Sequence, residues 1–288
     1  CKRRAEGSIS HDCAGRRMNR LSPEAITWNR RWIGSLGEEL SSPVEIHDQL
    51  GGSMHILRTL RRQLRAVGGH DFFEKPDIQI PNQHYGSAYG GWCIIPEGIK
   101  PDSVVYSFGI GHDASFDIAI IEQLGVTVEA FDPTPSSVEW VEAQHFSPNF
   151  HMHAYGLADI DGLVTFNPPE DAHHVSHTML DRPSTAAHAV TVPVKRLATI
   201  THELGHDHVD ILKMDIEGAE YQVVTDLLAS TIRPSQLLVE YHHRFPGVGI
   251  ARSKASIAAL RAAGYALFAV SATGEEYSFV FRGLKSLH

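Results

Sequence analysis

Cysteine is scarce in this sequence. Cys1, Cys13 and Cys93 are the only three in 288 residues, too few for a disulfide framework, which favours a reducing compartment. No apolar run reaches the ~18 residues that a membrane-spanning helix needs, and no signal peptide is visible. We therefore predict a cytoplasmic protein without a membrane span. Because the chain begins at Cys1 rather than Met, it is interpreted as a fragment or a processed product, and a lost targeting segment stays open.

Positive charge is also in short supply. The chain has 25 Lys and Arg against 34 Asp and Glu, and its net charge of −9 argues against a nucleic-acid partner. Residues 1–75 hold 13 basic and 9 acidic side chains, whereas residues 76–288 hold 12 and 25. We expect residues 1–75 to form a basic extension, partly disordered and then helical. Its arginines form either a solvated helix face or a surface for an anionic partner.

Hydrophobic residues make up 42% of the chain, enough for an ordinary globular core, and from Pro101 they alternate between strand and helix patterns. The predicted strands cover residues 104–108, 126–131, 150–155, 209–214, 237–241, 266–270 and 277–281. The predicted helices cover residues 115–124, 136–145, 219–228 and 253–263, with a short one inside 194–204. This alternation predicts an α/β fold whose mostly parallel sheet is covered on both faces. The last two strands are expected to pair as a hairpin, and a separate hairpin is expected over residues 77–95.

The first of these strands ends in two glycines, and the second ends in an acid. Gly109 and Gly111 stand at a strand-to-helix turn, where the missing side chains let a ligand approach the backbone. Ala114 replaces the third glycine of a dinucleotide fingerprint, which counts against a pyrophosphate site. Asp132, followed by Pro133, is suited to ribose hydroxyls, although an Asp-Pro turn is the simpler alternative. Together these residues indicate an adenosine-type cofactor.

Three acids and a histidine follow the two strands 209–214 and 237–241. Asp215 and Glu217 come directly after the first, and Glu240 and His242 come at the end of the second. Ligands bind at the carboxyl ends of strands in an open α/β sheet, so we predict that these four residues are catalytic. Asp215 is the first choice, as proton acceptor, cofactor contact or metal ligand, whereas Glu217 could instead cap the next helix. Asp215, Glu240 and His242 could also hold a divalent ion, but a resident metal is not expected.

Another segment matches a zinc-protease signature. His202-Glu203-Leu204-Gly205-His206 has the spacing that puts two imidazoles on one face of a helix. However, Gly205 is typical of a helix end, and the buried strand 209–214 follows closely, so His206 is expected to lie outside the helix. A zinc metallopeptidase is therefore kept only as a remote alternative.

The order of the motifs between residues 77 and 281 resembles the FkbM-type family of S-adenosylmethionine-dependent methyltransferases. The segments that carry the resemblance are, in chain order, Tyr89-Gly90-Gly91-Trp92, Tyr106-Ser107-Phe108-Gly109-Ile110-Gly111, Phe131-Asp132-Pro133, Gly156-Leu157-Ala158-Asp159, Asp161-Gly162, Val194-Lys195-Arg196-Leu197 and Asp210-Ile211-Leu212-Lys213-Met214-Asp215-Ile216-Glu217-Gly218-Ala219-Glu220. The last segment is the hallmark of the family. The zinc-like pentapeptide falls in the loose linker before it.

The resemblance implies a Rossmann-like methyltransferase domain over residues 76–288, with a seven-stranded sheet and S-adenosylmethionine as cofactor. The residues that it implies for cofactor binding are Ser107, Phe108, Gly109, Gly111, Asp113, Ser115, Asp132, Pro133, Gly156, Leu157, Ala158 and Asp215. One position departs from the family, which usually places an acid where this chain has Ser107, to contact the methionine amino group. The implied reaction is O-methylation of a hydroxyl on a sugar, a glycan or a small natural product.

Other interpretations stay open. Because of Ser107, the alternative is a non-catalytic methyltransferase-like module that binds a partner through the basic extension. The loops 171–183 and 245–252 are expected to contact the methyl acceptor, since substrate groups usually come from loops. The histidines His173, His174 and His177 are interpreted as a chance cluster, which is a weak metal candidate. The segment Asn167-Pro168-Pro169-Glu170 is interpreted as a turn. The oligomeric state is left open.

Overall fold

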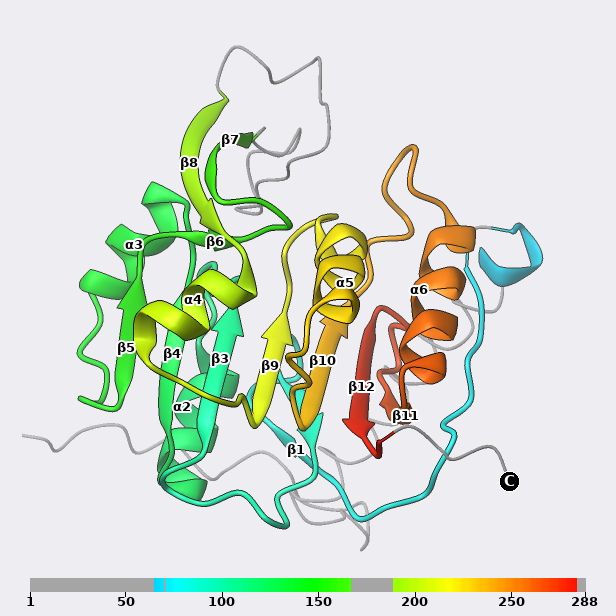
Figure 1. The fold of residues 1–288 in the computed structure, drawn as a ribbon, viewed down its shortest axis with the longest axis horizontal. Helices are drawn as coiled ribbons and strands as arrows, with labels where there is room; N and C mark the ends of the chain where they lie inside the picture. Colours follow the sequence, from blue (N-terminus) through cyan, green and yellow to red (C-terminus); the bar gives the residue numbers. More distant parts are fainter. Residues whose placement is uncertain (1–64, 70, 167–188, 284–288) are drawn as a thin grey trace, which may run out of the picture. The chain divides into compact units, whose positions relative to one another are not determined.

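The computed structural model describes residues 65–69, 71–166 and 189–283, which form an α/β fold (Figure 1). Most of the predicted extension over residues 1–75 lies outside these ranges. The turn at Asn167-Pro168-Pro169-Glu170, the cluster of His173, His174 and His177, and the loop 171–183 lie outside them as well. None of the described helices combines the length and the hydropathy that a bilayer crossing requires.

A seven-stranded sheet forms the centre of the described fold. Its strands are β3 (Val104–Phe108), β4 (Thr127–Phe131), β5 (Phe150–His153), β9 (Ile211–Met214), β10 (Gln236–Glu240), β11 (Tyr265–Val270) and β12 (Glu276–Phe281), in the spatial order β11-β12-β10-β9-β3-β4-β5. Neighbours are parallel from β10 to β5, whereas β12 is antiparallel to both β10 and β11. The predicted Rossmann-like sheet with one antiparallel C-terminal strand is confirmed.

Helices cover both faces of this sheet (Figure 1). They are α2 (Ser115–Leu124), α3 (Pro135–Glu142), α4 (Leu197–Leu204), α5 (Glu220–Ala229) and α6 (Ile250–Ala262). Successive side chains of a strand point to opposite faces. In β3, Val105 therefore packs on the side of α2 and α3, whereas Tyr106 and Phe108 pack on the side of α4, α5 and α6. Both faces are thus buried, which explains why the central strands are continuous hydrophobic runs.

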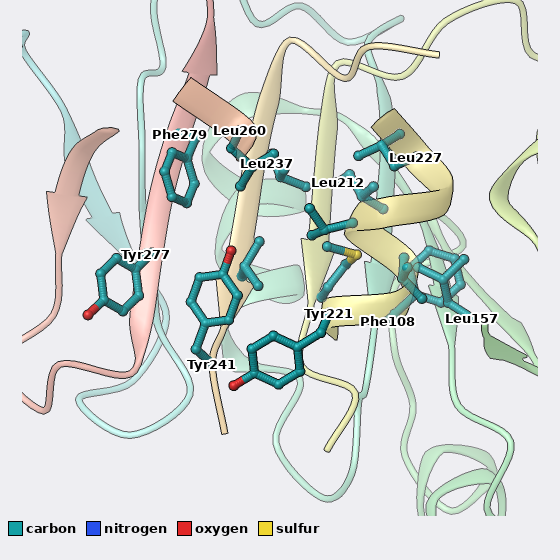
Figure 2. Close-up of a cluster of buried hydrophobic side chains, with 14 of the residues drawn as sticks. Phe108, Leu157, Leu212, Tyr221, Leu227, Leu237, Tyr241, Leu260, Tyr277 and Phe279 are labelled. Carbon is teal, nitrogen blue, oxygen red and sulfur yellow. The ribbon is translucent and has the colours of Figure 1, made fainter. Parts of the chain in front are cut away.

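The larger of the two core clusters lies under α4, α5 and α6. Figure 2 shows Leu212 and Leu237 of the sheet beside Leu227 of α5 and Leu260 of α6. Each of these four leucines is at most 2% exposed. Full burial of one such side chain is worth about 1.5–3 kcal/mol, so this cluster holds β9 and β10 firmly in place. The residues that follow these two strands are fixed by the same packing.

The hairpin that the sequence predicts over residues 77–95 is shorter in the structure. Its strands are β1 (Gln83–Tyr85) and β2 (Trp92–Ile94), which pair antiparallel and pack on the α2 side of the sheet. The predicted start of the hairpin at residue 77 is wrong, because residues 77–82 form no strand. Instead, Asp77 runs beside β11, where its backbone N–H donates to the Leu267 carbonyl at 2.7 Å.

A second, three-stranded sheet stands beside the main one (Figure 1). It contains β6 (Gly156–Leu157), β8 (Val190–Lys195) and β7 (Gly162–Phe166), with β6 parallel and β7 antiparallel to β8. The sequence pattern also predicts two shorter extended pieces, over residues 163–166 and 189–194, and the structure shows that they pair with each other as β7 and β8. Phe166, Val192 and Val194 form the small buried core of this sheet.

Candidate functional site

A cavity of about 870 Å³ lies at the carboxyl ends of β3, β4, β9 and β10. This size is in the range of small-molecule and cofactor sites. Most of the residues predicted for cofactor binding or catalysis line it: Phe108, Gly109, Gly111, Asp113, Asp132, Pro133, Gly156, Leu157, Asp215, Glu217 and Glu240. The structure therefore joins the glycine turn after β3 and the acids after β9 and β10 in one cavity.

The glycine turn packs directly on the segment after β9. Gly109 has φ +80°, and a side-chain carbon added to it would lie 1.7 Å from the Asp215 carbonyl oxygen. The Asp215 N–H in turn donates to the Phe108 carbonyl at 3.1 Å. Gly111 also has positive φ, +54°, but an added carbon there would meet no atom within 4 Å. Gly109 thus serves packing, and Gly111 leaves open space for a ligand to approach.

Asp132 holds the shape of this turn. Its Oδ2 accepts hydrogen bonds from the backbone N–H groups of Ile110 at 3.1 Å and Gly111 at 2.9 Å. Its Oδ1 accepts from the N–H and the hydroxyl of Thr134, at 2.9 and 2.6 Å. Each carboxylate oxygen has about two good acceptor positions, so protein donors fill this carboxylate. The contact with ribose hydroxyls stays a prediction, and the structure adds a second role, fixing the glycine turn.

Asp113 and Ser115 tie the hairpin to the start of α2. Asp113 Oδ2 accepts from the Ser87 hydroxyl at 3.0 Å, and Asp113 Oδ1 accepts from the Ser115 N–H at 2.8 Å. Burial opposes ionisation of Asp113, but the bonds from Ser115 and Ser87 lower its pKa below its ordinary value. Ser115 Oγ accepts from the Ser87 N–H, so it supports the hairpin rather than lining the cavity. The two residues position Tyr89 and its neighbours at the cavity.

Ser107 lies below the cavity and not in its lining. Since side chains alternate along β3, Ser107 shares the face of Val105 and points toward α2, where it lies beside the buried Asp117. A cofactor contact by its side chain is therefore not available in this arrangement. Beneath the turn, Lys213 Nζ donates instead to the carbonyl oxygens of Phe108 at 3.3 Å and Gly109 at 2.9 Å. The buried Lys213 thus contacts the glycine turn from below.

Ala158 also lies outside the lining. It is 1% exposed and packs in the small sheet, and its N–H donates to the Lys195 carbonyl at 3.0 Å. Ala158 therefore supports the cavity from behind rather than contacting a cofactor directly. It anchors the end of β6, whose Gly156 and Leu157 do reach the cavity.

The carboxylate end of the cavity is built around His242. This imidazole is 7% exposed, so it is buried behind the lining. Its Nε2 lies 3.7 Å from Asp215 Oδ1, 3.4 Å from Glu217 Oε2 and 4.0 Å from Glu240 Oε1. On the other side of the ring, Nδ1 contacts Oε1 of Glu220, whose side chain is fully buried. All four residues predicted to be catalytic are therefore brought together, with Glu220 as a fifth member.

The pKa values of His242 and Glu240 are shifted by burial and by the neighbouring carboxylates. Burial of His242 favours its neutral form, but the carboxylates of Glu220, Glu217 and Glu240 raise its pKa well above the ordinary value. Burial and the charge of Asp215 raise the pKa of Glu240 well above its ordinary value. The surrounding carboxylates therefore favour the protonated imidazole. An imidazole that favours its protonated form is less suited to accept a proton than a carboxylate is.

Backbone strain is found at the same place. Glu217 has φ +53° and is the only non-glycine residue with positive φ in the described ranges. Such a conformation costs of order 1 kcal/mol and persists where the surroundings enforce it, often at functional sites. It turns the chain sharply between β9 and α5, so that Asp215 and Glu217 both reach the cavity.

Two acids that line the cavity are not among the predicted residues. Glu275 lies in the turn between β11 and β12, and Glu276 is the first residue of β12 and pairs in register with Glu240 of β10. Because β12 is antiparallel, its first residues reach the same sheet edge as the last residues of β10. The predicted C-terminal hairpin, followed to its turn, could have located both acids.

The zinc-like segment has no catalytic geometry. Gly205 has φ +71° and ends α4, so His206 lies outside the helix, as the sequence predicts. His206 Nδ1 lies 2.7 Å from the Tyr106 hydroxyl, and Glu203 pairs with Lys195. In the described part of the chain, the residues whose ligand atoms come close enough for a metal are others: Asp215, Glu240 and His242. Nothing here supports a metallopeptidase.

The second predicted acceptor loop, 245–252, does not reach this cavity. Its residues Phe245 to Ile250 line a different cavity of about 740 Å³, together with Arg65, His243 and Arg244. Two of these residues, His243 and Arg244, pair with the buried Asp71. The loop thus does not line the cavity of the glycine turn, although the Phe245 ring packs on the ring of His242, with centroids 4.7 Å apart.

Comparisons with known proteins agree with one another. The sequence model described as "Methyltransferase FkbM domain" matches residues 101–267. "Probable methyltransferase-like protein 24" from Homo sapiens is 29% identical over 156 residues, which are 53% of this chain and 36% of that protein. Its Rattus norvegicus counterpart is 26% identical with the same coverage. A crystal structure of methyltransferase FkbM from Methylobacillus flagellatus KT aligns over 63% of this chain and 44% of that one, with 14% identity and a TM-score of 0.40. The chain spans about a third of the length of the curated relatives.

Proposed function

Because the chain belongs to the FkbM methyltransferase domain family, we propose that it transfers a methyl group from S-adenosylmethionine to a hydroxyl of a sugar, a glycan or a small natural product. The observation that carries this proposal is the single cavity that joins the glycine turn to the acids after β9 and β10. One end of it suits a nucleoside, and the other end suits a hydroxyl that must lose a proton.

The residues at the glycine-turn end fit such a cofactor. Gly111 offers open space where any other residue would place a side chain, and the backbone around it is fixed by Asp132. Pro133, Gly156 and Leu157 add a mostly apolar wall beside the turn. A flat, partly apolar group with a few polar contacts is what a site of this kind binds. S-adenosylmethionine, when bound, supplies an electrophilic methyl group on a sulfonium.

The residues at the other end hold the acceptor and take its proton. An alcohol is a weak nucleophile, so its attack is assisted by a base that accepts the hydroxyl proton as the carbon–oxygen bond forms. Asp215 lies next to Gly109 and therefore adjoins both halves of the cavity. We assign the base to Asp215, with Glu217 and Glu240 orienting the acceptor. Holding donor and acceptor in one enclosed space supplies the remaining rate enhancement by proximity and orientation.

A second candidate function rests on Ser107. The acid that the family usually has at this position is replaced by a buried serine whose side chain does not line the cavity. This feature favours a module that keeps the fold and binds a ligand without turnover. The two candidates differ in one measurable property, which is methyl transfer.

Calorimetry with S-adenosylmethionine and S-adenosylhomocysteine tests cofactor binding, and a labelled-methyl assay with extracted glycans and small alcohols tests transfer. We expect both cofactor forms to bind, and transfer to require Asp215. Heat without transfer to any acceptor would favour the binding module. No heat with either compound, from protein shown to be folded by circular dichroism, would contradict the proposed function.

A further inference from the structure

We propose that Asp215, Glu240 and His242 bind a divalent metal ion at the acceptor end of the cavity. This reverses the expectation from sequence that no metal is resident. Binding of the ion follows from the geometry alone, whereas its role in methyl transfer rests on the proposed function. The chemical class is a divalent cation that accepts both oxygen and imidazole ligands.

The three side chains lie close to the separations of metal ligands, and small side-chain movements would close the remaining difference. One ligand atom of each lies within 4.8 Å of the others. Around an octahedral ion with bonds of ~2.1 Å, adjacent ligand atoms are ~3.0 Å apart and opposite ones ~4.2 Å apart. The distances from His242 Nε2 to Asp215 and Glu240, 3.7 and 4.0 Å, fall between these values. They exceed the ~2.7–2.9 Å of a charge-assisted hydrogen bond, so these contacts leave room for an ion.

His242 is aimed at this point by a buried partner. Its Nδ1 contacts Glu220, which is fully buried and also accepts from the Gly218 N–H at 3.1 Å. With Nδ1 engaged, only Nε2 faces the cavity. A carboxylate that holds the far nitrogen of a metal-binding histidine is the usual arrangement around metal sites, because it fixes the ring and its tautomer. Glu220 is therefore a positioning residue in this proposal.

Asp215 supplies an independent observation. Its Oδ1 is buried, and it accepts no hydrogen bond from any residue in the described ranges. A buried anionic oxygen without a donor is costly, by about 1–3 kcal/mol or more. A cation beside Oδ1 would satisfy it directly.

The neighbouring basic side chains do not fill this role. Lys213 Nζ is engaged with the carbonyl oxygens of Phe108 and Gly109. Arg244 pairs with Glu275 and with Asp71, away from the three proposed ligands. Among the described residues, neither Lys213 nor Arg244 pairs with Asp215 or Glu240, and the buried imidazole of His242 lies beside both, which is a setting that favours a small cation.

Two carboxylates and one imidazole fit Mn²⁺, since hard oxygen ligands suit Mg²⁺ and Mn²⁺ while imidazole suits transition ions. Three protein ligands leave coordination positions open on the cavity side. An acceptor hydroxyl bound at one of them would have its pKa lowered by the ion, and the Asp215 oxygen that does not hold the ion would accept its proton. The methyl carbon–sulfur bond would then break as the oxygen–carbon bond forms, leaving a thioether and a methyl ether.

Mn²⁺ alone, titrated into the full chain and followed by electron paramagnetic resonance, tests the site without any methyl donor. We expect saturable binding of one ion. Asp215→Asn and Glu240→Gln should weaken it by at least ~10-fold, and Glu220→Gln by ~10–100-fold, the range for residues that orient a ligand. Nitrogen coupling to the bound Mn²⁺ should vanish in His242→Gln. Glu276→Gln is the matched control, because it removes one charge from the same cavity but no ligand, so it should change affinity by less than ~3-fold.

Equal affinity in wild type and all the variants, or no binding to wild type at millimolar Mn²⁺, would overturn the metal site. Equal weakening by Glu276→Gln and Asp215→Asn would show nonspecific attraction to the acidic cavity, which also overturns it. Folding of each variant is checked by circular dichroism. The two proposals fail separately: Mn²⁺ binding without S-adenosylhomocysteine binding removes only the proposed function, and the converse removes only the metal.

Discussion

The two ends of the cavity use similar residues but satisfy them differently. At the glycine-turn end, both oxygens of Asp132 and both oxygens of Asp113 accept hydrogen bonds from the protein. At the carboxylate end, Asp215 Oδ1 accepts none within the described residues, and three carboxylates crowd the Nε2 of His242. At the glycine-turn end, the carboxylates are therefore satisfied by the protein itself. At the carboxylate end, the negative charge is balanced by binding a proton or a metal ion.

This difference shows where unfavourable interactions gather in the cavity. Buried polar groups are normally paired, and exceptions mark strain reservoirs, catalytic groups or bound ions. The strained Glu217 lies at the carboxylate end too, two residues after Asp215. Among the described residues that line the cavity, backbone strain and an unsatisfied buried oxygen therefore coincide at the end where the reaction is proposed. The predictions that follow perturb one end at a time.

The largest effect is expected at the carboxylate end. Asp215→Asn keeps the shape of the side chain but removes the charge, so transfer to the acceptor should fall ~10²–10⁴-fold, the usual contribution of a positioned base. The matched control is Asp102→Asn, at an exposed turn position outside the cavity, which should leave kcat unchanged. Steady-state kinetics with a labelled methyl donor measures both. Equal rates in the two variants would mean that Asp215 takes no part in the reaction.

The contact between the two ends is tested by a pair of glycines. Gly109→Ala would force a carbon to 1.7 Å from the Asp215 carbonyl at φ +80°, so the free energy of unfolding should fall by more than ~2 kcal/mol. Gly111→Ala has similar strain but meets no atom within 4 Å, so it should lose only ~1 kcal/mol. Urea denaturation gives both values.

The same pair separates packing from ligand access. Gly111→Ala places its new carbon in the cavity lining, so S-adenosylhomocysteine should bind more weakly than its small loss of stability would suggest. If Gly111→Ala binds as wild type does, the open space beside Gly111 is not where the ligand lies. If Gly109→Ala is as stable as Gly111→Ala, the turn is free to move away from Asp215.

At the cofactor end, Asp132→Asn should have an intermediate effect. The amide nitrogen of Asn is a donor, and it would face donors that now reach one oxygen of Asp132, either the Ile110 and Gly111 N–H groups or those of Thr134. Leaving such groups unpaired costs ~1–3 kcal/mol in the free energy of unfolding. Thermal and urea unfolding, with calorimetry of S-adenosylhomocysteine, give stability and affinity together. A stable variant with weak cofactor binding would favour direct ribose contact over the fixing of the turn.

The comparison also explains how far the sequence could go. Parallel strands and buried runs are local patterns, so β3 and α2 are predicted with the bounds that the structure shows. Asp215, Glu240 and His242 meet because strand ends share one edge of a sheet, a rule that needs no coordinates. These predictions depend only on periodicity and topology.

What the sequence could not show depends on direction and pairing. Ser107 lies in β3 just before the glycine turn, yet only the alternation of side chains along β3 decides that it faces α2 rather than the cavity. Glu220 stands in the hallmark motif, but its contact with His242 joins residues 22 positions apart. The acids at 275 and 276 lie at the turn of the predicted C-terminal hairpin, but no local motif marks them as site residues, and only the pairing of β12 with β10 places them at the cavity. Side-chain direction and long-range partners are tertiary properties, and a single sequence does not encode them locally.

The smallest effect is expected in the pH dependence of stability. It concerns Asp113, a carboxylate whose two oxygens accept hydrogen bonds from the protein. The pKa of Asp113 lies below its ordinary value of 3.8, so its contribution to stability is complete above that pH and is lost as the pH falls through the lowered pKa. Asp113→Asn should therefore flatten the acid side of the stability curve, by less than ~1 kcal/mol because the group is partly exposed. Urea unfolding at a series of pH values, with Asp102→Asn as the control that follows wild type, measures this. Divergence of the Asp113→Asn curve from wild type only well above pH 3.8 would contradict the assignment, because a carboxylate satisfied by hydrogen bonds can lose stability only at lower pH.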